Sequence, residues 1–98
     1  MIDVFLLLGS NLGDRQAFLS NARDHIETDV APIISVSSVY ETQSWGKTDQ
    51  PDYLNQVLYL KTDVPARVLL EKILHIEMLM GRKREEKWGS RIIDIDIL

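Results

Sequence analysis

Strand-like and helix-like hydrophobic patterns follow one another along this 98-residue chain in an order that few folds accommodate. An apolar run over 4–8 stops at Gly9 and predicts a buried strand. The segment 34–40 has a period of two, 54–61 is again strand-like, and 92–98 is rich in β-branched residues. The sequence therefore predicts four strands.

Two helical patterns separate these strands. Asp14 is the expected N-cap of a helix over about 15–27, and Asp63 that of a second helix with Pro65 in its first turn. Gly81 stands where a glycine typically ends a helix. Each helix has an apolar stripe on one face, formed by Phe18, Ala22 and Ile26 in the first and by Leu69, Ile73, Ile76 and Met80 in the second.

The resulting order is β-α-β-β-α-β, which is typical of an α+β protein with the ferredoxin-like pattern. We expect a four-stranded antiparallel sheet with two helices on one face, forming a single domain over 1–98. This fold hosts many unrelated functions, so function has to be argued from particular residues.

Composition excludes several functional classes. The chain carries 15 acidic and 11 basic residues, a net charge of −4, which disfavours nucleic-acid binding. It has no cysteine, which excludes disulfides and cysteine-based zinc sites and agrees with a reducing cytoplasm. The apolar run over 4–8 is too short to span a bilayer, and Asp3 stands where a signal peptide carries positive charge. We expect a cytoplasmic protein with neither nucleic-acid nor membrane partners.

A pair of carboxylates lies in the last predicted strand. Asp94 and Asp96 are two residues apart, so both point to the same face, with their Cα atoms roughly 6.5–7 Å apart. Two such carboxylates repel each other, and a bound Mg²⁺ would relieve that cost because it prefers oxygen ligands. The competing interpretation is an ordinary half-exposed strand with its acidic side chains in solvent.

A basic segment directly precedes this strand. Residues 82–91 hold five Lys or Arg and two Glu, a local charge of +3. Such cations could clamp a polyphosphate whose metal ions the two carboxylates hold. The alternative is a solvated charged loop. Trp88 within it is either a hydrophobic anchor or a lid over a base or ring.

The segment from Trp88 to Leu98 resembles the signature of the hydroxymethyldihydropterin pyrophosphokinase family. Three further blocks resemble that family in the same order: residues 9–15 its first strand-to-helix loop, and residues 40–46 and 49–55 its pterin-binding segment. The resemblance implies transfer of pyrophosphate from ATP to 6-hydroxymethyl-7,8-dihydropterin, with AMP as the second product, in folate biosynthesis. It implies ATP as co-substrate, two Mg²⁺ ions, and ATP and the reduced pterin as small-molecule partners, and it leaves the oligomeric state open.

The resemblance also implies roles for individual residues. The metal ligands are Asp94 and Asp96, which form the catalytic set together with Arg82 and Arg91. The implied ATP-binding residues are Glu77, Arg82, Arg84, Trp88 and Arg91. The implied pterin-binding residues are Thr42, Trp45, Tyr53 and Asn55. Without the resemblance, Asn55 could equally satisfy backbone groups at a loop-to-strand junction, and the aromatic residues could be core.

The chain departs from the family pattern in two ways. Ser44 and Ser90 stand where the family often has proline, which removes rigidity from both loops. Family members also continue for several dozen residues beyond the strand that carries the aspartates. We therefore expect weak or absent turnover from this chain alone. The alternatives are a non-catalytic ferredoxin-like module that binds a small ligand or regulates a partner, and, less favoured by the acidic charge, an RNA-binding module.

Overall fold

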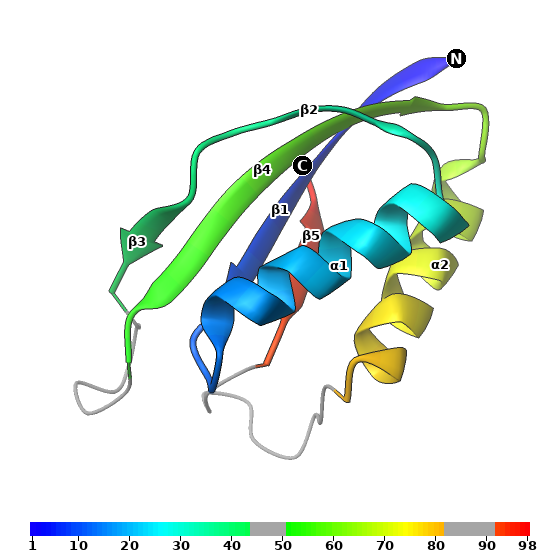
Figure 1. Ribbon diagram of the computed structural model, residues 1–98. Helices are drawn as coiled ribbons and strands as arrows, with labels where there is room; N and C mark the ends of the chain where they lie inside the picture. Colours follow the sequence, from blue (N-terminus) through cyan, green and yellow to red (C-terminus); the bar gives the residue numbers. More distant parts are fainter. Residues whose placement is uncertain (44–50, 82–91) are drawn as a thin grey trace.

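The computed structural model describes residues 1–43, 51–81 and 92–98. Two helices lie against an antiparallel sheet (Figure 1). The elements are β1 (Ile2–Ser10), α1 (Arg15–Asp29), β2 (Ile33–Val36), β3 (Tyr40–Thr42), β4 (Tyr53–Thr62), α2 (Ala66–Leu79) and β5 (Asp94–Ile97).

The sheet has the strand order β2-β4-β1-β5, and β3 pairs with β4 beyond the end of β2. Each of these pairings is antiparallel. β1 and β4 are the central strands. The outer strands, β2 and β5, each follow a helix in the chain: β2 follows α1 and β5 follows α2. This is the predicted ferredoxin-like arrangement. Within the described ranges, neither helix is both long and apolar enough to cross a membrane.

The predicted strand over 34–40 is interrupted in the structure. Its register against β4 shifts between Ile33 and Ser35, and regular pairing stops after Val36. The Ser37 side chain replaces a backbone acceptor in the pairing with β4: its Oγ accepts a hydrogen bond of 2.8 Å from the Val57 amide. A hydroxyl that bonds backbone competes with regular strand pairing. Residues 37–39 therefore lie outside the regular strands, and only Tyr40 of the predicted segment belongs to the separate strand β3.

The helix α1 begins as predicted and buries a slightly different stripe. Asp14 Oδ1 accepts a hydrogen bond from the Ala17 amide, at 3.1 Å, which confirms the N-cap. The buried side chains are Leu19, Ala22 and Ile26, whereas Phe18 is half-buried at the edge of the stripe. The spacing of three and then four residues follows the helical period more closely than steps of four.

The N-cap predicted for α2 is wrong. The Asp63 carboxylate instead forms an ion pair of 3.1 Å with the N-terminal ammonium group. Pro65 occupies the N-cap position, and no side chain caps this end. Leu69, Ile73 and Ile76 are buried as predicted, and Met80 is partly buried. Gly81 follows the helix with a φ of +85°, which glycine adopts without strain.

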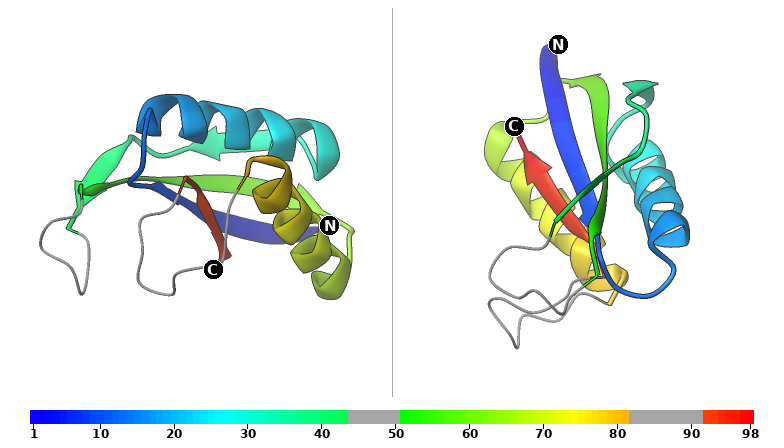
Figure 2. Two further views of the ribbon diagram at one scale, coloured as in Figure 1. Left: turned by 90° about the horizontal axis from the view of Figure 1, so that it is seen from below. Right: turned by 90° about the vertical axis from the view of Figure 1, so that its left-hand side faces the viewer.

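Strand alternation separates a core face of the sheet from an open one. The core face carries buried apolar side chains that pack with the stripes of the helices, and α1 lies along the sheet (Figure 2). The buried strand residues are Val4, Leu6, Leu8, Leu54, Leu58, Leu60 and Ile95. The residues that alternate with these along each strand, including Gly9 and both aspartates of β5, therefore lie on the open face.

A substitution at Leu60 tests this assignment of faces. Leu60 is fully buried and its neighbour Lys61 is exposed. We expect Leu60→Ala to lower the free energy of unfolding by about 2–5 kcal/mol, because it leaves a cavity in the core. Lys61→Ala, one residue further, should change it by less than about 0.5 kcal/mol. Urea unfolding followed by circular dichroism measures both; equal losses would contradict the assignment.

A second test concerns Tyr59, which stacks on Phe5 with ring centroids 5.0 Å apart. Its hydroxyl donates a 2.7 Å hydrogen bond to Asp3 Oδ1. This bond, reinforced by desolvation and by the negative charge of Asp3, raises the Tyr59 pKa above its ordinary value of 10.0. A raised pKa stabilises the fold below pH 10, and this contribution is lost as the pH rises through the folded-state pKa. Asp3→Asn should therefore lower the Tyr59 pKa. The absorbance of tyrosinate as a function of pH measures this pKa, and the Tyr59→Phe variant shows which part of the signal belongs to Tyr59. An unchanged Tyr59 titration in Asp3→Asn would refute the prediction.

Candidate active site

The two aspartates of β5 lie on the open face of the sheet, beside the central strand β1. Asp94 pairs with Gly9, and Asp96 pairs with Leu7. Both side chains therefore point to the same face, as predicted from their spacing. Asp94 is half-buried and Asp96 is exposed.

These carboxylates share one hollow of about 170 Å³ with three of the predicted pterin-binding residues. The lining residues are Leu7, Gly9, Thr42, Gln43, Tyr53, Asn55, Asp94 and Asp96. They come from β1, β3, β4 and β5 and from the residue after β3. Two sets of residues that are distant in sequence are thus brought together on one surface, because β1 pairs with β4 on one side and with β5 on the other.

Gly9 keeps the floor of this hollow open. It lies directly between Asn55 and Asp94 in the sheet. A Cβ atom at this position would come within 3.3 Å of Asn55 Oδ1 and 3.4 Å of a ring carbon of Tyr53. Any larger residue would therefore crowd the Asn55 amide and fill the space in front of the Tyr53 ring. Glycine leaves room for a ligand to approach the amide and the carboxylate together.

Asn55 has a defined orientation within the hollow. Its side-chain Nδ2 donates a 2.8 Å hydrogen bond to Thr42 Oγ1 and makes longer contacts with the carbonyl oxygens of Tyr40, at 3.4 Å, and Tyr53, at 3.5 Å. The residue is 8% exposed. With its amide nitrogen held by β3 and β4, Asn55 turns its Oδ1 towards Gly9. It therefore presents an acceptor to the hollow.

Glu77 reaches the same strand from the opposite side. It is 5% exposed, projects from α2, and its Oε2 accepts a 2.8 Å hydrogen bond from the Ile95 amide. A second hollow, of about 370 Å³, is lined here by Leu70, Leu74, Glu77, Asp94, Ile95, Asp96 and Ile97. Both aspartates thus border two hollows, and the predicted ATP-binding glutamate lines one of them.

The carboxylates of Asp94 and Asp96 are suited to magnesium. In proteins Mg²⁺ is usually held by one or two carboxylates, and water and substrate phosphates complete its coordination. Among the described residues, no three His, Cys, Asp or Glu side chains come together closely enough to hold a metal ion. The two carboxylates of β5 by themselves supply oxygen donors of the kind that Mg²⁺ prefers.

Five of the predicted site residues lie outside the described parts of the chain. They are Trp45, Arg82, Arg84, Trp88 and Arg91. Their roles stay predictions. The structure does bring together Thr42, Tyr53, Asn55, Asp94 and Asp96 around one hollow, with Glu77 behind β5.

Two residues that sequence reasoning left without a role support the site. Asn11 is fully buried, and its Nδ2 donates to the Pro51 carbonyl at 3.2 Å. Arg15 Nη1 donates to the Asp52 carbonyl at 2.7 Å and lies 3.9 Å from Glu41 Oε2. Both hold the backbone just before Tyr53. The only sequence signal was their place in the 9–15 block that resembles the family.

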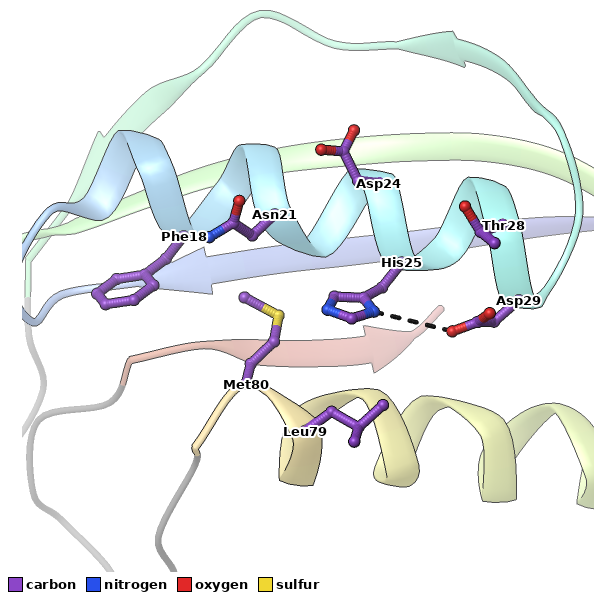
Figure 3. A pocket seen from close by; sticks show the side chains of 8 residues that line it. All are labelled: Phe18, Asn21, Asp24, His25, Thr28, Asp29, Leu79 and Met80. Carbon is purple, nitrogen blue, oxygen red and sulfur yellow. Dashed lines mark ion pairs between the residues drawn. The ribbon is translucent and has the colours of Figure 1, made fainter.

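A larger hollow, of about 450 Å³, lies between α1 and α2, away from these residues (Figure 3). Phe18, Leu79 and Met80 form its apolar part. His25 also lines it, with Nδ1 3.8 Å from Asp29 Oδ2 in the next turn of the helix. The His25 side chain is half-buried. None of the predicted site residues lines this hollow.

The sequence is similar to known proteins over nearly its whole length. Residues 5–98 match the family model described as 7,8-dihydro-6-hydroxymethylpterin-pyrophosphokinase. Three relatives bear the name 2-amino-4-hydroxy-6-hydroxymethyldihydropteridine pyrophosphokinase. The protein of Methylorubrum extorquens is 42% identical over 99 residues, which cover 100% of this chain and 63% of the relative. The protein of Aquifex aeolicus is 45% identical over 98 residues, which cover 100% of this chain and 61% of the relative.

The third relative, from Bacillus subtilis, is 41% identical over 95 residues, which cover 96% of this chain and 57% of the relative. The chain thus spans about three-fifths of the length of these relatives. The family match covers nearly the whole chain, and these relatives are 41–45% identical to it. On this evidence the chain belongs to the 7,8-dihydro-6-hydroxymethylpterin-pyrophosphokinase family.

Proposed function

We propose that the whole protein transfers pyrophosphate from ATP to 6-hydroxymethyl-7,8-dihydropterin in folate biosynthesis, giving AMP and the pterin diphosphate. This is the activity of a 2-amino-4-hydroxy-6-hydroxymethyldihydropteridine diphosphokinase. The observation that carries the proposal is the single hollow that joins Asp94 and Asp96 to Thr42, Tyr53 and Asn55. A transfer between two substrates needs their sites to be adjacent, and the location of both sets of predicted residues around one hollow supports the proposal.

On the nucleotide side, Asp94 and Asp96 would hold two Mg²⁺ ions. When bound, such ions neutralise phosphate charge and orient the groups that react. The hydroxymethyl oxygen forms a bond to the β-phosphorus, the bond from that phosphorus to the α,β-bridging oxygen breaks, AMP leaves, and the hydroxyl proton passes to solvent. We assign phosphate clamping to Arg82, Arg84 and Arg91, and closure over ATP to Trp88, following the family resemblance.

On the pterin side, Asn55 supplies specificity. A pterin ring has N–H groups along one edge, and an oriented amide oxygen accepts a hydrogen bond from one of them. The contact of Asn55 Nδ2 with Thr42 Oγ1 fixes that orientation. Tyr53 lines the hollow and offers a flat apolar surface to the ring, a role that we extend to Trp45.

The proposed partners are therefore small molecules. A net charge of −4 gives no electrostatic basis for binding nucleic acid. We place the reaction in the cytoplasm, because ATP and a reduced pterin are its substrates. The same substrates give the proposal two direct tests.

Asp96→Ala tests the nucleotide side. We expect it to weaken magnesium-dependent binding of a non-hydrolysable ATP analogue by about ten- to hundredfold, because a charged ligand to the metal is lost. Titration calorimetry at fixed Mg²⁺ measures this. Asp24→Ala, which removes an exposed carboxylate on α1, is the matched control and should leave binding unchanged. Wild-type affinity in Asp96→Ala would instead favour a non-catalytic module.

Thr42→Val tests the pterin side. Valine keeps the shape of threonine but cannot accept the hydrogen bond of Asn55 Nδ2, so the amide loses its fixed orientation. We expect about a tenfold loss of pterin affinity, measured through the fluorescence of the ring, with little change in nucleotide affinity. The control is Thr28→Val in the hollow between the helices. If both variants bind pterin equally well, Thr42 does not orient the site.

A further inference from the structure

The strand that carries both aspartates is held by a side chain from another element. β5 lies at the edge of the sheet and pairs only with β1 in the described structure. Amide groups of alternate residues in such a strand point away from its partner. The amide of Ile95, between Asp94 and Asp96, is one of these, and it donates to Glu77 Oε2 at 2.8 Å. The carboxylate of Glu77 thus takes the place of a neighbouring strand.

Glu77 occupies an unusual position for a charged residue. It belongs to the buried stripe of α2, with Ile73 and Ile76, and is 5% exposed. Burying a carboxylate is costly unless hydrogen bonds compensate it. A bond to a backbone amide provides part of that compensation and at the same time fixes the carboxylate relative to β5. Leucine at this position would extend the apolar stripe, so stability alone does not explain a glutamate.

A direct metal-ligand role is the alternative to a role of Glu77 through the backbone of β5. Among the described residues, no three acidic, His or Cys side chains are arranged to hold a metal, although Glu77, Asp94 and Asp96 line the same hollow. The Glu77 carboxylate does bond the backbone between the two aspartates. The Ile95 side chain is 5% exposed in the core, so this residue is anchored by its apolar side chain as well as by its amide.

We infer that Glu77 is a positioning residue, which fixes β5 and thereby sets the spacing at which Asp94 and Asp96 meet the magnesium ions of the nucleotide. The inference rests on the proposed function and refines the ATP-binding role implied for Glu77. Glu77 then acts on ATP through the strand. An alternative that the experiment must separate is a direct effect of its negative charge on the metal.

Three variants of the 98-residue chain separate these roles. Glu77→Leu removes both the charge and the acceptor, whereas Glu77→Gln removes the charge and keeps an acceptor. Glu71→Leu, at an exposed position of the same helix, is the matched control. Two quantities are measured for each: amide hydrogen exchange of Ile95 by NMR, with Leu58 in the central strand as reference, and affinity for Mg²⁺ with a non-hydrolysable ATP analogue.

We expect Glu77→Leu to speed Ile95 exchange, relative to Leu58, by at least about tenfold and to weaken nucleotide binding by about ten- to hundredfold. Glu77→Gln should bring both the Ile95 exchange rate and the nucleotide affinity to within about fivefold of wild type. The reason is that a neutral acceptor still bonds the amide, about half as strongly as a carboxylate does. Glu71→Leu should change neither quantity. The recovery by glutamine is the result that distinguishes positioning from charge.

Two results would overturn the inference. The first is a Glu77→Gln variant with Ile95 still protected but nucleotide binding as weak as in Glu77→Leu, which would assign a direct role to the charge. The second is a Glu77→Leu variant with unchanged exchange and affinity. If the wild-type chain binds no magnesium–nucleotide, the nucleotide site proposed for these residues fails in this chain, and the exchange measurement alone then supports or overturns the hold of Glu77 on β5.

Discussion

The pairing of β1 with a strand on each side is the constraint on which the site depends. Gly9 pairs with Asn55 of β4 and with Asp94 of β5, so the amide and the carboxylate line one hollow from opposite sides of a residue without a side chain. Alternation along β1 also turns Leu6 and Leu8 into the core. One strand therefore anchors the fold with one face and opens the site with the other.

Local patterns predicted those features that depend on neighbouring residues. The period of two placed Asp94 and Asp96 on one face, and the helix start at Asp14 needed only a cap three residues before Ala17. The meeting of Asn55 with the aspartates was not predictable from spacing, because it depends on registers between distant strands. The family resemblance supplied that grouping, and the structure gave its geometry.

The failures have a common physical cause. Asp63 resembles a helix cap in sequence, but the N-terminal ammonium group, brought near by the fold, takes its carboxylate. Asn11 and Arg15 look like ordinary loop and helix-surface residues, yet they bond carbonyl groups 40 and 37 residues away. Polar side chains choose partners in three dimensions, and sequence patterns report mainly the partners that lie within a few residues.

Electrostatics explains why the arrangement around β5 suits a ligand better than it suits stability. Asp94, Asp96 and the buried Glu77 place three carboxylates along one short strand, in a chain whose net charge is already −4. Like charges on one strand face destabilise a sheet, and burying a third adds a desolvation cost. Proteins tolerate such local conflicts at functional sites. Cations bound together with a nucleotide would remove the repulsion, so binding and the relief of that cost become the same event.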